Sequence, residues 1–134
     1  MREIDLGSAD FTYEGTNLII RSRMDLHPAM PQDGAVIDII GELNLYSTPH
    51  LKSIMNKLIE NERIKLILNT DKLNYIDSSG LGVFLNIQSK LLKLGGYIHI
   101  CAPTTQVMSI LELTKLKSML KIYRTIEDSF ISKV

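Results

Sequence analysis

Short apolar runs alternate along this chain with segments of helical periodicity, and this alternation restricts the fold more than any other feature. Apolar runs occupy residues 35–40, 64–68 and 97–101. Behind Thr48, and again behind Asp77, apolar residues recur at the spacing of an amphipathic helix. Strands that alternate with helices favour a mainly parallel sheet, because each crossover returns the chain to the same edge.

The remaining segments complete the order of elements. In residues 17–26, Leu18, Ile20, Met24 and Leu26 fall on one face of a strand, and with residues 35–40 this segment indicates an antiparallel hairpin around a loop over 27–34. A third helix begins near Pro103, followed by a strand over 120–124 and a short terminal helix. We predict an α/β fold, a mixed and mainly parallel sheet of about five strands with an N-terminal hairpin and helices packed on the sheet.

Two of the predicted helices carry boundary signals. Thr48 and Pro49 predict an N-cap followed by proline at the first helical position. Gly95 and Gly96 predict the end of the second helix, where one glycine takes a left-handed conformation. The second helix has a broad apolar stripe, which we expect to be buried; it consists of Leu81, Phe84, Leu85, Ile87, Leu91, Leu92 and Leu94.

Length and charge restrict the class of protein. The chain has 134 residues, enough for one domain, which we place at 16–134 behind an N-terminal extension over 1–15. This extension is expected to be a loose arm or an added edge strand. Fifteen basic and fifteen acidic residues give a formal net charge of zero, so there is no electrostatic reason to expect nucleic-acid binding. Neither a membrane-length apolar run nor a signal-peptide pattern is present, which favours a cytoplasmic protein without membrane contact.

Residues that could support metal binding or catalysis are scattered. His27, His50 and His99 lack the spacing of metal ligands, and no serine lies in a nucleophile elbow. The glycines form no phosphate-binding loop, so we expect neither a metal nor a cofactor. Cys101 lies inside an apolar run and reads as a buried thiol.

The octet over residues 75–82, Tyr-Ile-Asp-Ser-Ser-Gly-Leu-Gly, is the strongest candidate for a functional site. Asp77 or Ser78 is a favourable N-cap, and capping alone is a sufficient structural reason for either residue. Capping does not explain Gly80 and Gly82, since each glycine early in a helix costs about 1 kcal/mol relative to alanine. We interpret both as leaving the backbone bare on the outer side of the helix, where another protein could approach.

Asp77–Gly82 after an apolar strand resembles the signature of the anti-sigma factor antagonists, which are small bacterial proteins with a STAS domain. Three further segments match the same family: Gly41–Asn44 resembles its G-E-L-D turn, Leu94–Gly96 its L-G-G segment, and Ala102–Pro103 with Leu111–Thr114 the two ends of its third helix. The resemblance covers about residues 18–132.

The resemblance implies a binding module and not an enzyme. The unphosphorylated antagonist of such a system binds an anti-sigma factor, usually also a serine kinase, and thereby frees a sigma factor. The kinase phosphorylates the first serine after the aspartate, here Ser78, and a PP2C-type phosphatase restores the protein. The expected contact residues are Asp77, Ser79, Gly80, Leu81, Gly82, Val83, Asn86, Glu42 and Asn44. We expect a monomer or a weak dimer.

Other functions of the same family remain open from sequence. STAS domains also occur as regulatory or scaffold modules in stress-sensing, signalling and lipid-transport assemblies, and some are nucleotide-binding proteins. Two residues depart from the family pattern. Asn44 stands where an aspartate is usual, and Lys115 stands where many members have glycine after the third helix, which we interpret as a local change in the helix ending.

Overall fold

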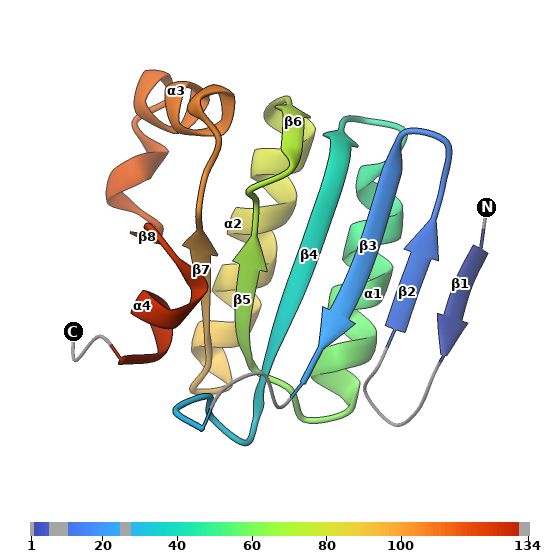
Figure 1. Ribbon diagram of the computed structural model, residues 1–134, viewed down its shortest axis with the longest axis vertical. Coiled ribbons are helices and arrows are strands. Elements are labelled where there is room, and N and C mark those ends of the chain that lie inside the picture. Colours follow the sequence, from blue (N-terminus) through green and yellow to red (C-terminus); the bar gives the residue numbers. More distant parts are fainter. Residues whose placement is uncertain (1, 6–10, 25–27, 132–134) are drawn as a thin grey trace.

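The computed structural model describes residues 2–5, 11–24 and 28–131. Within them it forms an eight-stranded sheet in the order β1-β2-β3-β4-β5-β7-β8, with β6 paired to β4 (Figure 1). The strands are β1 Arg2–Asp5, β2 Phe11–Glu14, β3 Leu18–Arg23, β4 Gly34–Leu43, β5 Lys65–Asn69, β6 Leu73–Ile76, β7 Tyr97–Cys101 and β8 Lys121–Tyr123. The helices are α1 Thr48–Glu60, α2 Ser78–Lys93, α3 Thr105–Leu113 and α4 Ile126–Ile131, with a 3₁₀ turn over Leu116–Ser118.

This architecture confirms the predicted α/β fold with a mixed sheet. β3 and β4 form the expected antiparallel hairpin, and β4, β5, β7 and β8 are parallel neighbours. The sheet has more strands than the five expected, because β1 and β2 extend its edge and the short strand β6 pairs with the end of β4. Leu26 and His27, placed by sequence in the first strand and its loop, lie outside the described residues.

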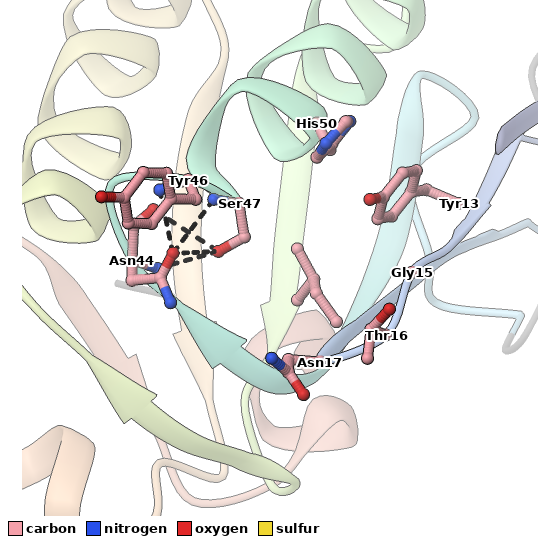
Figure 2. Close-up of a pocket in the computed structure, with 9 residues that line it drawn as sticks. Tyr13, Gly15, Thr16, Asn17, Asn44, Tyr46, Ser47 and His50 are labelled. Atoms are coloured by element: carbon pink, nitrogen blue, oxygen red, sulfur yellow. Dashed lines mark hydrogen bonds between the residues drawn. The ribbon is translucent and has the colours of Figure 1, made fainter. Parts of the chain in front are cut away.

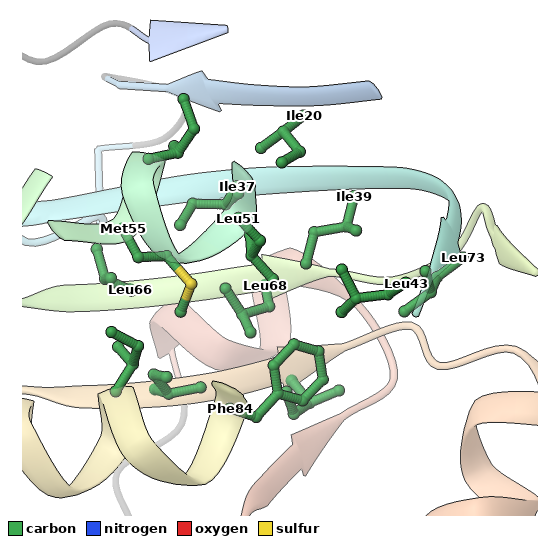
Figure 3. Close-up of a cluster of buried hydrophobic side chains, with 14 of the residues drawn as sticks. Ile20, Ile37, Ile39, Leu43, Leu51, Met55, Leu66, Leu68, Leu73 and Phe84 are labelled. Carbon is green, nitrogen blue, oxygen red and sulfur yellow. The ribbon is translucent and has the colours of Figure 1, made fainter. Parts of the chain in front are cut away.

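The main hydrophobic core lies between the sheet and helices α1 and α2, which cover one face of the sheet (Figure 1). Leu51 and Met55 of α1 and Phe84 of α2 are fully buried against alternate residues of β4 and β5 (Figure 3). Because side chains alternate across a strand, Ile37 and Leu68 face this core while their chain neighbours face the other side. The sheet therefore holds both long helices at fixed positions.

A smaller core lies on the opposite face, under α4. Val36, Ile67 and Cys101 are fully buried there, and Ile126 and Phe130 pack against them. Burial raises the pKa of the Cys101 thiol to about 11, so this thiol is protonated at neutral pH. This confirms the prediction of a buried cysteine.

Strand β2 belongs to the main core although sequence placed it in an extension. Phe11 and Tyr13 are each 3% exposed and face α1, whereas the alternate residue Glu14 is exposed. The Tyr13 ring stacks on His50 of α1 with 4.0 Å between the ring centroids. Residues 11–14 therefore form an added strand of the sheet, and α1 packs against it.

The boundaries of α1 and α2 differ in part from those predicted. α1 begins at Thr48, so its N-cap position falls on Ser47 and not on Thr48, and the Ser47 side chain makes no capping hydrogen bond. At the end of α2, Gly95 takes the expected left-handed conformation with a φ of 82°, and the Gly96 N–H donates to the Leu91 carbonyl at 2.8 Å. The apolar stripe ends earlier than predicted: Leu92 and Leu94 are 61% and 51% exposed.

Lys115, where we expect a local change in the helix ending, follows α3 with a left-handed backbone. This residue has a φ of 62°, in the left-handed region that glycine adopts without steric cost. The backbone conformation usual for glycine is therefore retained although a lysine is present. A side chain in this region costs roughly 1–2 kcal/mol, which the surrounding helix and 3₁₀ turn must offset.

The burial of the Phe11 ring predicts that this ring contributes to the free energy of unfolding of the domain. Phe11→Ala should lower the free energy of unfolding by about 3 kcal/mol, since removal of a buried aromatic ring leaves a cavity. Glu14→Ala, three residues along and exposed, should change it by less than about 0.5 kcal/mol. Urea titration followed by circular dichroism measures both, and equal small effects would show that residues 11–14 are a detachable arm.

Candidate partner-binding site around Ser78

The candidate site lies where β4 and β6 end, at the edge of the sheet drawn uppermost in Figure 1. β4 leads into the 44–47 loop before α1, and β6 leads through Asp77 into α2. The two strands are parallel here, with Glu42 opposite Tyr75 and Leu43 opposite Ile76. The carboxyl edge of parallel strands is the usual position of binding sites in open α/β sheets.

Asp77 is the N-cap of α2, which confirms one of the two capping residues considered from sequence. Its backbone is extended, and its carboxylate accepts hydrogen bonds from the N–H groups of Ser79 and Gly80 at 2.9 and 3.3 Å. These are two of the N–H groups that have no partner within the helix. The cap therefore fixes the direction in which the first turn presents Ser78.

Ser78 begins an exposed ridge along α2. Ser78, Gly82 and Asn86 are spaced by four residues and all three are exposed, so they lie on one face of the helix. Ser79 is half-buried beside this ridge. A methyl group added at Gly82 would have open space around it. The helix backbone is therefore bare at Gly82, and contact with another protein at this residue stays a prediction.

Gly80 and Leu81 do not belong to the exposed surface, and this corrects their predicted role as contact residues. Leu81 is 3% exposed, and Gly80 is buried over β6. A Cβ atom at position 80 would lie 2.6 Å from Ile76 Cγ1 and 3.1 Å from Leu43 Cδ2. Gly80 is thus needed for the close approach of α2 to the strands, and not for the approach of a partner.

Glu42 and Asn44, which the sequence predicted as contact residues, lie on different elements. Glu42 belongs to β4, and Asn44 begins the loop that follows it. Glu42 is exposed next to Tyr75 of β6. Asn44 is half-buried, and its Oδ1 accepts hydrogen bonds from the N–H groups of Tyr46 and Ser47 at 2.9 and 3.1 Å (Figure 2). Asn44 therefore organises the loop, and an uncharged amide oxygen is sufficient for that purpose.

The residues that sequence reasoning missed are apolar and exposed in the same region. Leu45 is 64% exposed, Tyr46 84% and Tyr75 41%. Two apolar side chains next to one another in a connector between strand and helix are the signal that could have indicated them. Val83, by contrast, is half-buried and packs against the core, so only part of it belongs to the surface.

The described residues contain no group of His, Cys, Asp and Glu side chains that could hold a metal ion. His50 stacks on Tyr13, and His99 is 8% exposed between Tyr97 and Tyr123, with ring centroids 4.0 and 4.9 Å away. The contacts of both histidines are thus packing contacts with tyrosine rings. In the described part of the chain, the helices are too short or too polar to span a bilayer.

A mixed sheet with helices packed on it, and a helix α2 capped by Asp77 directly after β6, is the arrangement of a STAS domain. The family model of the STAS domain matches residues 27–129, and the chain belongs to this family. A Thermotoga neapolitana protein with the provisional name of anti-sigma factor antagonist is 31% identical over 90 residues, which cover 66% of this chain and 79% of the relative.

Two further comparisons point to the same family. The anti-sigma-B factor antagonist of Staphylococcus aureus is 23% identical over 86 residues, which cover 64% of this chain and 80% of the relative. The anti-sigma factor antagonist SpoIIAA, solved in its unphosphorylated form, superimposes with a TM-score of 0.68 at 21% identity, covering 82% of this chain and 91% of SpoIIAA. At this identity the superposition shows a shared fold. SpoIIAA from Bacillus has also been solved in a phosphorylated form.

The two glycines of the octet should respond in opposite directions to the same substitution. Gly82→Ala should raise the free energy of unfolding by up to about 1 kcal/mol, because alanine favours the helix and meets no neighbour. Gly80→Ala should lower it by about 1–3 kcal/mol, because the new methyl group overpacks against Ile76. Chemical denaturation measures both changes, and a loss of stability in Gly82→Ala would contradict the exposed position of residue 82.

His99 should make stability depend on pH between about 6.5 and 4. Burial, aided by the nearby Lys121 charge, lowers the pKa of His99 from 6.5 to about 4. The unfolded chain therefore takes up this proton first as the pH falls, and the native state loses at most about 2 kcal/mol between pH 7 and 4.5. His99→Phe should lose less stability than the native protein over the same interval. Parallel unfolding curves at both pH values would show the difference, and equal losses would refute the assignment.

Proposed function

We propose that this protein is an anti-sigma factor antagonist of the bacterial cytoplasm whose unphosphorylated form binds an anti-sigma factor with serine kinase activity. Binding releases a sigma factor, phosphorylation of Ser78 ends the binding, and a PP2C-type phosphatase reverses the modification. The observation that carries this proposal is the exposed Ser78 at the start of the α2 ridge, directly after the Asp77 cap. The names of the similar proteins support the same conclusion.

Exposure favours Ser78 over Ser79 as the phosphate acceptor. Ser78 is exposed at the first position of α2, whereas Ser79 is half-buried and donates its N–H to Asp77. A kinase needs to reach the hydroxyl with its own active site, so the exposed serine is the better substrate. The modification adds about −1.5 to −2 charge at pH 7.

The Asp77 cap makes a phosphate on Ser78 disruptive for binding. The Asp77 carboxylate already uses the N–H groups of Ser79 and Gly80, so the phosphate adds like charge beside it and competes for the same donors. The α2 dipole still limits the cost to the fold. A loss of about 3 kcal/mol in the interface weakens binding roughly a hundredfold, at 1.4 kcal/mol for each factor of ten.

Ser78→Asp should bind the anti-sigma factor at least tenfold more weakly than Ser78→Ala, because a charge at this position opposes the contact. Calorimetric titration of both variants against the purified anti-sigma factor of the source organism, with ADP present, measures the difference. Incubation of the native protein with the same kinase and ATP should modify Ser78, as peptide mass mapping would show.

Ser79→Ala is the matched control for this experiment. It should remain a kinase substrate, whereas Ser78→Ala should not. Equal affinities of Ser78→Asp and Ser78→Ala would overturn the switch, and phosphate mapped to Ser79 would overturn the choice of serine. Unfolding curves of the variants establish that the changes in affinity do not come from a loss of structure.

A further inference from the structure

Leu45 and Tyr46 form an exposed apolar pair on the loop between β4 and α1. They are 64% and 84% exposed, and Tyr46 is the most exposed large hydrophobic side chain of the described residues. Single apolar residues are common on protein surfaces, but two in sequence on a protruding loop are less so. Tyrosine is also among the residues that most often dominate the binding energy of interfaces.

The loop that carries the pair is held in one conformation by side-chain hydrogen bonds (Figure 2). Asn44 Oδ1 accepts from the N–H groups of Tyr46 and Ser47. In return, Ser47 Oγ accepts from the Asn44 N–H at 2.8 Å and donates to the Glu42 carbonyl at 3.0 Å. A loop that is ordered before binding loses little conformational entropy when a partner covers it.

The pair is structurally continuous with the Ser78 site. The residue before Asn44, Leu43, accepts a hydrogen bond from the Asp77 N–H at 3.2 Å through its carbonyl. Its side chain is buried and lies against the first turn of α2 at Gly80. The loop and the start of α2 are thus connected through one residue, and a partner seated on Ser78 lies beside the loop.

The surface next to Tyr46 shows which partner chemistry it would accept. A pocket of about 210 Å³ lies between the loop and the turn after β2, and it is lined among others by Tyr13, Asn17, Ser47 and His50. Its lining contains hydroxyl, amide and aromatic groups, and no carboxylate or ammonium group. This surface therefore suits a neutral, partly apolar partner surface, with one partner side chain entering the pocket.

We propose that Leu45 and Tyr46 are the anchor with which this protein holds its anti-sigma factor, inserting into an apolar cleft of that partner. The inference rests on the proposed function and deepens it. The anchor is uncharged and supplies affinity, whereas Ser78 supplies the charge that ends the contact. Tyr13 and His50, supplied by the added strand β2 and by α1, line the adjacent pocket.

Tyr46→Ala should weaken binding of the unphosphorylated protein to the anti-sigma factor by about thirtyfold, the effect typical of an interface hot spot. Leu45→Ala should weaken it severalfold. Leu92→Ala is the matched control, since Leu92 is 61% exposed but lies near the other end of α2. It should bind within about twofold of the native protein. Calorimetric titration with the purified anti-sigma factor and ADP measures all four proteins.

The outcomes separate the anchor from the proposed function. If Ser78→Asp prevents binding while Tyr46→Ala binds like the native protein, the anchor is wrong and the switch stands. If the native protein does not bind the anti-sigma factor, the proposed function fails. If Tyr46→Ala leaves binding intact but converts a dimer to a monomer by light scattering, a second copy covers the pair and the anchor is overturned. Unchanged unfolding curves for Tyr46→Ala exclude misfolding as the cause.

Discussion

Gly41 lies where the central strand β4 shifts its register against β6, and the position of the site depends on the pairing of these two strands. Its φ of 112° is accessible to glycine, and a Cβ at this position would lie 2.2 Å from the Asn17 carbonyl oxygen. The register of β4 against β6 shifts between Gly41 and Glu42, after β4 has left β5 at Asp38. Beyond this irregularity, the Leu43 carbonyl accepts a hydrogen bond from the Asp77 N–H at 3.2 Å. The first residue of the G-E-L-N segment is therefore a backbone requirement.

Several features of the fold could be predicted because their signals are local. The end of α2 at Gly95 and the Asp77 cap each depend on one residue type at one backbone conformation. The exposure of Leu92 and Leu94 could not be predicted, because it depends on where the sheet ends beneath the helix. β2 could be predicted only as one of two alternatives for the N-terminal extension, a loose arm or an added edge strand, and for another reason. Its alternation of Phe11 and Tyr13 with polar residues is only four residues long, and it becomes significant only when α1 packs above it.

The candidate site likewise has a part that could be predicted from the sequence and a part that could not. Ser78, Gly82 and Asn86 could each be named as candidate residues from the octet and the family resemblance, and the structure places all three on one exposed face of α2. The sequence could not distinguish the two glycines. Gly82 faces open space and Gly80 faces Ile76, a difference that arises from the packing of α2 on β6. Tertiary contact, rather than residue type, therefore decides which glycine is available to a partner.

At position 44, the structural role of accepting hydrogen bonds does not depend on a charge. The Asn44 Oδ1 oxygen accepts two backbone hydrogen bonds and holds the loop, and an aspartate oxygen in the same place could accept them equally well. The loop therefore needs an acceptor but no charge. A neutral residue here leaves the lining of the pocket beside Tyr46 without a carboxylate.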